Sequence, residues 1–244
     1  MKVLASDYDG TLKVNDQLSD KDIETIKKWQ KGGNWFGVVT GRSPVTIKEE
    51  MKLWQLEPDF LICNNGGVIL NRNYEVLEIS RIPDDTAASL LDYIETTASS
   101  EVVVNNGVQR AKKQVGKDDV AALEVEKIKQ AGGIAQIVVW FSTQDKVKEV
   151  ADYINKEYSA VVEAFMNIKC IDIVPKGCNK GVGLEKIAEI YDIPLNSIYT
   201  IGDAFNDLPM LKIFTSATLE HAVDEIKAEV ETVVPNVASF LEKL

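Results

Sequence analysis

The sequence KVLASDYDGTL at residues 2–12 gives the strongest indication of the fold. Its apolar run at residues 3–5 is typical of a strand that is buried on both faces of a parallel sheet. Two carboxylates, Asp7 and Asp9, follow this run, and Gly10 comes next, as expected where the chain turns away from a strand. The stretch therefore predicts a buried strand with an acidic cluster at its carboxyl end.

Strand and helix signals alternate in the chain that follows. Apolar runs at residues 35–39 and 60–63 are predicted strands, and helices are predicted to begin after Ser19 and Ser43, whose side chains can cap them. The same pattern returns late in the chain, where a strand is predicted at residues 198–201. This alternation predicts an α/β fold with a Rossmann-like parallel sheet and right-handed crossovers.

The middle of the chain has a different pattern, which begins after a predicted hairpin at residues 68–79. Helices are expected there at residues 86–99, 118–130 and 145–158, and strands at residues 102–104, 134–141, 161–165 and 168–174. The last two strands have little chain between them, which favours an antiparallel sheet with helices on one face. We interpret residues 82–175 as an inserted α+β domain, and residues 1–81 and 176–244 as the first domain.

Composition limits the class of partner. The net charge of −11 argues against nucleic acid or an anionic membrane, because neither would find a basic surface. No apolar stretch reaches membrane-spanning length. The three cysteines form neither a disulfide framework nor a CxxC pair, which favours a reducing compartment. We expect a cytoplasmic protein with a small-molecule ligand and no obligate protein partner.

The chain contains a single histidine, His221. This count excludes a histidine-rich zinc site and an HExxH motif, and a Ser–His–Asp triad would lack the GxSxG turn. We interpret His221, in the polar segment TLEHAVDE, as a surface helix residue. The chemistry must therefore depend on carboxylates, lysine, hydroxyl groups or a metal.

Polar side chains stand at the ends of the predicted elements. They are Asp7 and Asp9 after the first strand, Thr40 after the second, Lys180 before a late helix, and Asp203, Asn206 and Asp207 after a late strand. Ligands of open parallel sheets bind at the carboxyl ends of the strands. Carboxylates that converge there would repel one another unless a cation lay among them, and such oxygen ligands favour Mg²⁺. The lysine and the threonine would supply donors for a phosphoryl group.

Each cluster also has a simpler explanation. Asp-x-Asp-Gly and GDAFND can form turns, Thr-Gly-Arg can begin a helix, and a single lysine is normally solvated. Any one of them alone would favour that simpler explanation. Their occurrence together, each at the end of a predicted element, favours a functional site.

Together the motifs resemble those of the haloacid dehalogenase (HAD) superfamily. DYDGTL at residues 7–12 resembles the DxDGTL signature, TGR at residues 40–42 the second motif, Lys180 the third, and GDAFND at residues 202–207 the GDxxND fourth motif. The resemblance covers nearly the whole chain. The large insert resembles the α/β cap of the Cof-like sugar-phosphatase branch, and the NG pair at residues 65–66 resembles that branch's turn after the third strand.

The resemblance implies a Mg²⁺-dependent mechanism. Asp7 would be the nucleophile that forms an aspartyl-phosphate, and Asp9 would act first as general acid and then as general base. The implied binding residues are Asp7, Asp203, Asp207 and the Asp9 carbonyl for the metal, and Thr40, Gly41, Arg42, Lys180, Asn65 and Asn206 for the phosphate. Arg42 is equally well interpreted as a helix-start residue, and Asn206 and Asp207 would support the metal or orient the lysine.

The second aspartate narrows the activity that the resemblance implies. Dehalogenases of the superfamily lack the acid at the position of Asp9, and P-type ATPases carry threonine there, so the resemblance implies a phosphatase or a phosphomutase. The leading hypothesis is a phosphatase acting on sugar phosphates or similar metabolites. A phosphomutase or a sucrose-phosphate-type phosphatase is an alternative of the same fold. A phosphoacceptor signalling module and a non-catalytic phosphometabolite-binding protein are alternatives from other classes. TSATLEHA at residues 215–222 departs from the branch's GVAMGNA-like segment, and the chain is short for the branch, so the substrate stays open.

Overall fold

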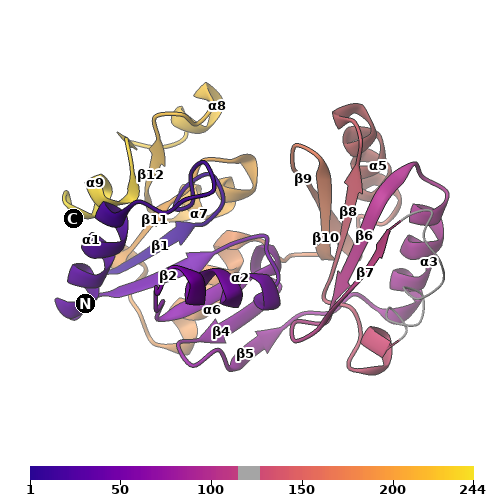
Figure 1. The fold of residues 1–244 in the computed structure, drawn as a ribbon, viewed down its shortest axis with the longest axis horizontal. Coiled ribbons are helices and arrows are strands. Elements are labelled where there is room, and N and C mark those ends of the chain that lie inside the picture. The colour runs from indigo at the N-terminus through magenta and orange to yellow at the C-terminus, as the bar shows by residue number, and fades with distance from the viewer. Residues whose placement is uncertain (115–126) are drawn as a thin grey trace. The chain divides into compact units, whose positions relative to one another are not determined.

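The structure of the chain is a computed structural model that describes residues 1–114 and 127–244. The described residues form two compact units (Figure 1). The core unit comprises Met1–Arg42, Thr46–Leu77 and Asn179–Leu244, and the insert unit comprises Ser43–Val45 and Glu78–Cys178. The core unit is therefore assembled from segments that lie far apart in the sequence.

Within the described residues, an eight-stranded sheet crosses the core unit in the order β13-β12-β11-β1-β2-β3-β4-β5. Its strands are β1 (Val3–Asp7), β2 (Trp35–Val39), β3 (Phe60–Cys63), β4 (Val68–Asn71), β5 (Val76–Ile79), β11 (Ile198–Ile201), β12 (Thr215–Leu219) and β13 (Thr232–Val234). The pairs from β13 to β3 are parallel, and β4 runs antiparallel to β3. The predicted α/β fold with a parallel sheet is confirmed.

Capping side chains begin two helices that hold site residues or cover the sheet. The helices are α1 (Asp20–Lys31), α2 (Pro44–Leu53), α6 (Lys180–Ile190), α7 (Leu208–Ile213), α8 (Asp224–Lys227) and α9 (Val237–Leu241), with short 3₁₀ turns at Asn64–Gly66, Leu195–Ser197 and Phe205–Asp207. The Ser19 side chain accepts a hydrogen bond of 3.0 Å from the Asp22 amide at the start of α1. The Asn179 side chain accepts one of 2.9 Å from the Val182 amide, which sets where α6 begins.

Apolar side chains bury both faces of the core sheet. On one face, Val3 of β1 belongs to a cluster with Leu184 of α6 and Met210 of α7. Successive side chains of a strand point to opposite faces, and Leu4 and Phe36, on the other face, are also completely buried. This double burial explains why the strand that opens the chain is a continuous apolar run rather than an alternating one.

The insert unit contains an antiparallel sheet in the order β7-β6-β8-β10-β9. Its elements are α3 (Asp84–Glu95), β6 (Ser99–Asn105), β7 (Arg110–Gln114), β8 (Gln136–Phe141), α5 (Gln144–Glu157), β9 (Val162–Met166) and β10 (Cys170–Pro175). Leu90 of α3 and Ile154 of α5 share one apolar cluster with the sheet, so both helices cover the same face, as predicted. Strand β7 was not predicted, and the helix predicted at residues 118–130 lies mostly outside the described residues.

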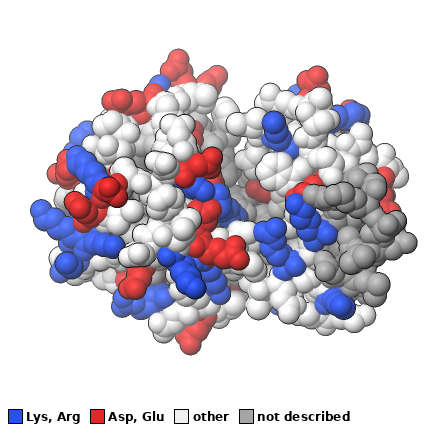
Figure 2. Space-filling view, viewed as in Figure 1, with Lys and Arg blue, Asp and Glu red and all other residues white. Residues whose placement is uncertain are grey.

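Acidic and basic side chains are interspersed on the face of the molecule in Figure 2. On α5, Lys146 pairs with Glu149 at 2.6 Å and Lys148 pairs with Asp152 at 2.8 Å. Exposed pairs of this kind contribute little to stability. No helix in the part of the chain that the structure describes has the length and apolar character needed to cross a membrane.

Candidate active site

Residues from the four motifs meet at the carboxyl edge of the core sheet. Asp7 is the last residue of β1, Thr40 directly follows β2, and Asp203 lies two residues after β11. Strands β11, β1 and β2 are adjacent and parallel, so these three ends share one edge. Lys180, the first residue of α6, reaches the same place through its side chain.

Lys180 joins two buried carboxylates. Its Nζ lies 2.5 Å from Asp7 Oδ1 and 2.5 Å from Asp207 Oδ1, and all three side chains are almost fully buried. Burial opposes the charged form of Lys180, but the charges of Asp207 and Asp7 outweigh it and raise the pKa of the ammonium. Burial, helped by the charge of Asp207, raises the pKa of Asp7 well above its ordinary value, although Lys180 acts in the opposite direction.

Both oxygens of Asp207 are occupied. Oδ1 accepts a hydrogen bond from Lys180, and Oδ2 accepts hydrogen bonds of 2.9 Å from the amides of Asp203 and Ala204. A completely buried carboxylate with donors on each oxygen is held in one orientation. Asp207 therefore holds the Lys180 ammonium beside Asp7.

Asp203 is the most accessible carboxylate of the cluster, with its side chain 17% exposed. Thr11 Oγ1 donates a hydrogen bond of 2.6 Å to its Oδ1. Burial raises the pKa of Asp203 and the nearby charge of Asp207 adds to this, which together outweigh the lowering by Thr11. Asp7, Asp203 and Asp207 can each offer one oxygen such that these atoms all lie within 4.8 Å of one another.

The cluster fits a divalent cation of the Mg²⁺ type. Its donor atoms are carboxylate oxygens, which are the ligands that Mg²⁺ prefers. One ammonium offsets only part of the charge of the three carboxylates, and a cation would relieve the repulsion that helps raise the pKa of Asp7 and of Asp203. Asp7 and Asp203 are the better ligands, because both oxygens of Asp207 already accept hydrogen bonds.

Glycines allow two close approaches around the cluster. Gly10 has a φ of +90°, and a Cβ atom there would collide with the carboxylate of Asp203. Gly66 has a φ of +97°, and a Cβ atom there would collide with the carbonyl of Asn179, the residue before Lys180. A side chain at either position would displace the Asp203 carboxylate or the start of α6.

Asp9 differs from the buried carboxylates in its exposure, because its side chain is 50% exposed. Arg42 donates to both of its oxygens, from Nε to Oδ2 and from Nη2 to Oδ1, each at 2.7 Å. The third donor, Nη1, reaches Glu50 Oε1 at 2.8 Å. In the described structure the Arg42 guanidinium is thus engaged with two carboxylates.

The other residues assigned to the phosphate form a connected set that begins with Thr40. Val39 pairs with Asp7 across β1 and β2, which places Thr40 next to the end of β1. The Asn65 backbone amide donates a hydrogen bond of 3.0 Å to the Thr40 carbonyl oxygen, and Asn206 Nδ2 donates one of 3.1 Å to Asn65 Oδ1. Asn65 adopts a φ of +49°, which asparagine tolerates well. Gly41 occupies the position between Thr40 and Arg42, so the residues of this set adjoin one another.

The prediction for His221 was wrong. His221 lies in the turn that follows β12 rather than on a surface helix. Because β12 is the parallel neighbour of β11, its end reaches the same sheet edge, and His221 Nε2 lies 2.8 Å from the Gly10 carbonyl oxygen and 4.0 Å from Asp203 Oδ2. The polar residues around His221 suit an exposed turn as well as an exposed helix face. The unusual TSATLEHA segment was the signal that could have placed it near the site.

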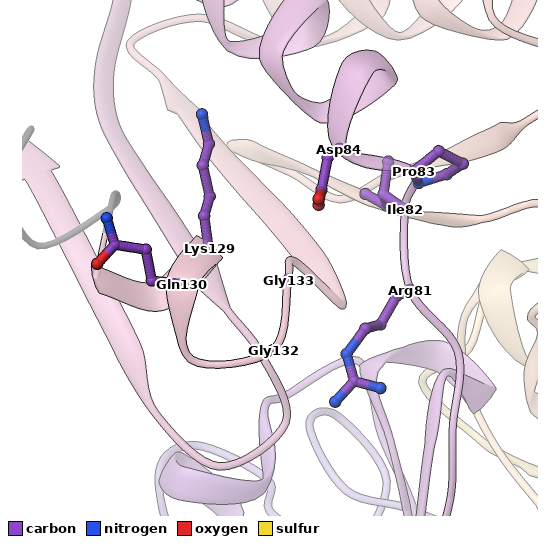
Figure 3. A pocket seen from close by; sticks show the side chains of 8 residues that line it. All are labelled: Arg81, Ile82, Pro83, Asp84, Lys129, Gln130, Gly132 and Gly133. Atoms are coloured by element: carbon purple, nitrogen blue, oxygen red, sulfur yellow. The ribbon is translucent and has the colours of Figure 1, made fainter.

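Cavities elsewhere in the described residues offer no comparable cluster. One of about 660 Å³ in the core unit is lined by Trp35 and Asp59, which stand at the amino ends of β2 and β3. One of about 440 Å³ in the insert unit is lined by Arg81, Ile82, Pro83, Asp84, Lys129, Gln130, Gly132 and Gly133 (Figure 3). The ends of the Arg81 and Lys129 side chains point in different directions there, so these charges do not converge on one ligand.

Comparison with known proteins gives a consistent result. Residues 4–239 match the family model of haloacid dehalogenase-like hydrolases. The 5-amino-6-(5-phospho-D-ribitylamino)uracil phosphatase YwtE of Bacillus subtilis is 24% identical, with 100% of this chain and 98% of that protein aligned. An HMP-PP phosphatase of Escherichia coli is 24% identical over 93% of this chain and 87% of its own.

Solved structures of similar fold also cover the whole chain. A haloacid dehalogenase-like hydrolase from B. subtilis has a TM-score of 0.85 at 19% identity, with 100% of each chain covered. The HAD subclass IIB sugar phosphatase BT4131 has a TM-score of 0.80 at 19% identity, with 100% of this chain and 98% of that chain covered. At this level of identity, the structures establish the fold.

Proposed function

Because the chain belongs to the haloacid dehalogenase-like hydrolases, we propose that it is a Mg²⁺-dependent phosphatase that hydrolyses small phosphomonoesters through an aspartyl-phosphate on Asp7. The observation that carries the proposal is the buried cluster of Asp7, Lys180, Asp203 and Asp207 at the carboxyl edge of the sheet. Relatives named as phosphatases of small phosphorylated compounds support the substrate class, with sugar phosphates or similar metabolites first.

In the first step, a carboxylate oxygen of Asp7 attacks phosphorus, and the bond from phosphorus to the ester oxygen breaks. Asp9, whose side chain is half exposed, gives its proton to the leaving alcohol. Lys180 keeps Asp7 in position and, with the Thr40 hydroxyl, donates hydrogen bonds to the transferring phosphoryl oxygens.

In the second step, water attacks phosphorus and the bond from phosphorus to Asp7 breaks. The Asp9 carboxylate takes the proton of the water, which returns Asp9 to its starting state and releases inorganic phosphate. A Mg²⁺ ion held by Asp7, Asp203 and the Asp9 carbonyl would neutralise charge shared by the carboxylates and the phosphate. Asp207 acts in this scheme by holding Lys180.

We further propose that residues 82–175 are a cap domain that selects the substrate, with residues 1–81 and 176–244 as the catalytic domain. The insert has its own sheet and its own apolar cluster, which supports treating it as a separate domain. Replacing residues 82–175 with the segment of YwtE that aligns with them should change which ester is hydrolysed fastest, while an Asp7→Asn change should abolish hydrolysis of every ester. An unchanged substrate ranking would contradict the cap assignment.

The proposed function is tested by phosphate release from a panel of small phosphate esters, with Mg²⁺ and with EDTA. We expect release that requires Mg²⁺, an aspartyl-phosphate detected on Asp7 by mass spectrometry after acid quench, and no release by Asp7→Asn. Asp224→Asn, at a side chain that is 99% exposed, is the matched control and should keep wild-type activity. Isomer formation without phosphate release would favour a mutase, and an Asp7→Asn variant as active as wild type would contradict the proposal.

A further inference from the structure

We propose that Glu50 is a positioning residue, which fixes the Arg42 guanidinium against Asp9 and so holds Asp9 for its acid–base role. The inference rests on the proposed function, in which Asp9 moves both protons. Glu50 lies on α2, outside every motif that marks the site in the sequence. Its carboxylate nevertheless contacts Tyr8 and Lys13, which lie in and beside the first motif.

Glu50 accepts hydrogen bonds from four side chains. Tyr8 Oη donates to Oε2 at 2.6 Å, Trp54 Nε1 to Oε2 at 3.2 Å, Lys13 Nζ to Oε1 at 3.1 Å and Arg42 Nη1 to Oε1 at 2.8 Å. The side chain is only 16% exposed. Burial would raise the pKa of Glu50, but the hydrogen bonds from Tyr8, Lys13 and Arg42 outweigh it and lower the pKa to about 2. Glu50 is therefore a fixed anion at neutral pH.

The geometry of the guanidinium transmits this constraint to Asp9. A guanidinium is planar, so an anchor on Nη1 sets the plane in which Nε and Nη2 can donate. Those two donors meet the two oxygens of Asp9 at 2.7 Å each. The Tyr8 ring lies 5.1 Å from Arg42 Cζ and limits movement of the group further. Glu50 and Tyr8 thus fix the plane of the Arg42 guanidinium, and the guanidinium in turn fixes the Asp9 carboxylate.

This constraint matters because Asp9 is half exposed. An exposed aspartate side chain moves readily between rotamers, whereas proton transfer needs the carboxyl within hydrogen-bond reach of the leaving oxygen. With Arg42 on both of its oxygens, Asp9 stays in one rotamer and keeps a second lone pair on each oxygen. Loss of the anchor should therefore slow the chemical steps more than it weakens substrate binding.

The kinetic test uses Glu50→Gln, which keeps the shape of the side chain and removes its charge. We expect kcat to fall by about 10- to 100-fold and KM to change little. Glu49→Gln, at an exposed glutamate one position earlier on the same helix, is the matched control and should match wild type. In an Arg42→Lys background, Glu50→Gln should cause no further fall in kcat, because the planar guanidinium through which Glu50 acts is already lost. Effects that multiply instead, or a rise in KM at constant kcat, would overturn the inference.

A second measurement does not depend on activity. The chain has four arginines, so the Nε–H signals in a ¹H–¹⁵N NMR spectrum are few, and the Arg42 signal is identified by its loss in Arg42→Lys. We expect a protected Arg42 signal in wild type and in Glu49→Gln, and exchange broadening or loss of this signal in Glu50→Gln. An unchanged signal in Glu50→Gln would overturn the inference. If no ester is hydrolysed, the proposed function fails, and this spectrum still decides whether Glu50 fixes Arg42.

Discussion

The site contains two groups of paired charges that differ in their exposure to water. Lys180 lies between Asp7 and Asp207, and the three side chains are 1%, 6% and 0% exposed. Asp9 lies only two residues after Asp7 and pairs with Arg42 of the second motif, yet the side chains of Arg42 and Asp9 are 28% and 50% exposed. Both groups have short hydrogen bonds, so distance alone does not distinguish them.

The difference follows from what each group does in the proposed mechanism. A nucleophile and its cation need a fixed geometry, and a buried pair is costly to disturb because either partner alone would be an uncompensated charge. A group that exchanges protons with a leaving alcohol and with water needs access to both, and its pairing contributes less to stability because water screens it. The contrast predicts that changes to the buried group lower the free energy of unfolding more than changes to the exposed pair.

Lys180→Met should cause the largest loss of stability. In metal-free protein it leaves Asp7 and Asp207 buried without their cation, and we expect unfolding in urea to require about 3–5 kcal/mol less than in wild type. Lys212→Met, at a lysine that is 51% exposed, is the control and should lie close to wild type. A loss below about 1 kcal/mol for Lys180→Met would mean that the buried group is no more constrained than a surface pair.

Gly10→Ala should have the next largest effect, because it combines backbone strain with a collision. Its φ of +90° disfavours a side chain, and the new Cβ must displace Asp203. We expect a loss of about 1–3 kcal/mol in urea unfolding and weaker Mg²⁺ binding by calorimetry. Gly33→Ala provides the comparison, because Gly33 has a φ of +82° with no atom within 4 Å of the added Cβ. Equal Mg²⁺ affinity in the two variants would show that the contact with Asp203 is unimportant.

Asp9→Asn should separate activity from stability. We expect kcat to fall by about 10²- to 10⁴-fold, because the acid–base group is lost. Urea unfolding should change by about 1 kcal/mol or less, because the pair with Arg42 is partly exposed. A destabilisation as large as that of Lys180→Met would remove the contrast between the two groups.

The smallest effect is a pH dependence at Glu50. Its pKa is lowered from the ordinary value of 4.5 to about 2, so its ionised form stabilises the folded protein above pH 4.5, and this contribution is lost as the pH falls towards 2. The difference in melting temperature between wild type and Glu50→Gln should therefore shrink over this range, as followed by circular dichroism. A difference that stays constant with pH would show that the charge of Glu50 does not stabilise the fold.

Much of the fold could be predicted because the signals are local. The run before Asp7 is apolar without alternation, as a strand of a parallel sheet requires, and Ser19 caps a helix through a contact three residues away. Asp7, Thr40 and Asp203 could be predicted to lie together because each follows a strand of one parallel sheet. Strand β7 escaped prediction because its sequence, RAKKQ, is strongly polar, although its pairing partner is the preceding strand, β6, in an antiparallel hairpin.

Parts of the site could not be predicted because they depend on long-range contacts. Glu50 is one acidic residue among 38 in the chain, and only the fold brings Tyr8, Lys13 and Arg42 to it. His221 was misplaced for the same reason, since its partner Gly10 is 211 residues away. The sequence near a residue does not indicate which remote residue will contact it.

The order of strands and helices, the identity of the four motifs and the acidic character of their meeting point follow from the sequence by itself, because hydrophobic periodicity and turn chemistry act over a few residues. The folded structure is needed to show which carboxylates are buried and which are exposed, and that Arg42 pairs with both Asp9 and Glu50. Burial and hydrogen bonding depend on every segment packed around a side chain, and these segments are remote in the chain. The local sequence therefore identifies the functional side chains, and packing determines their charge, orientation and mobility.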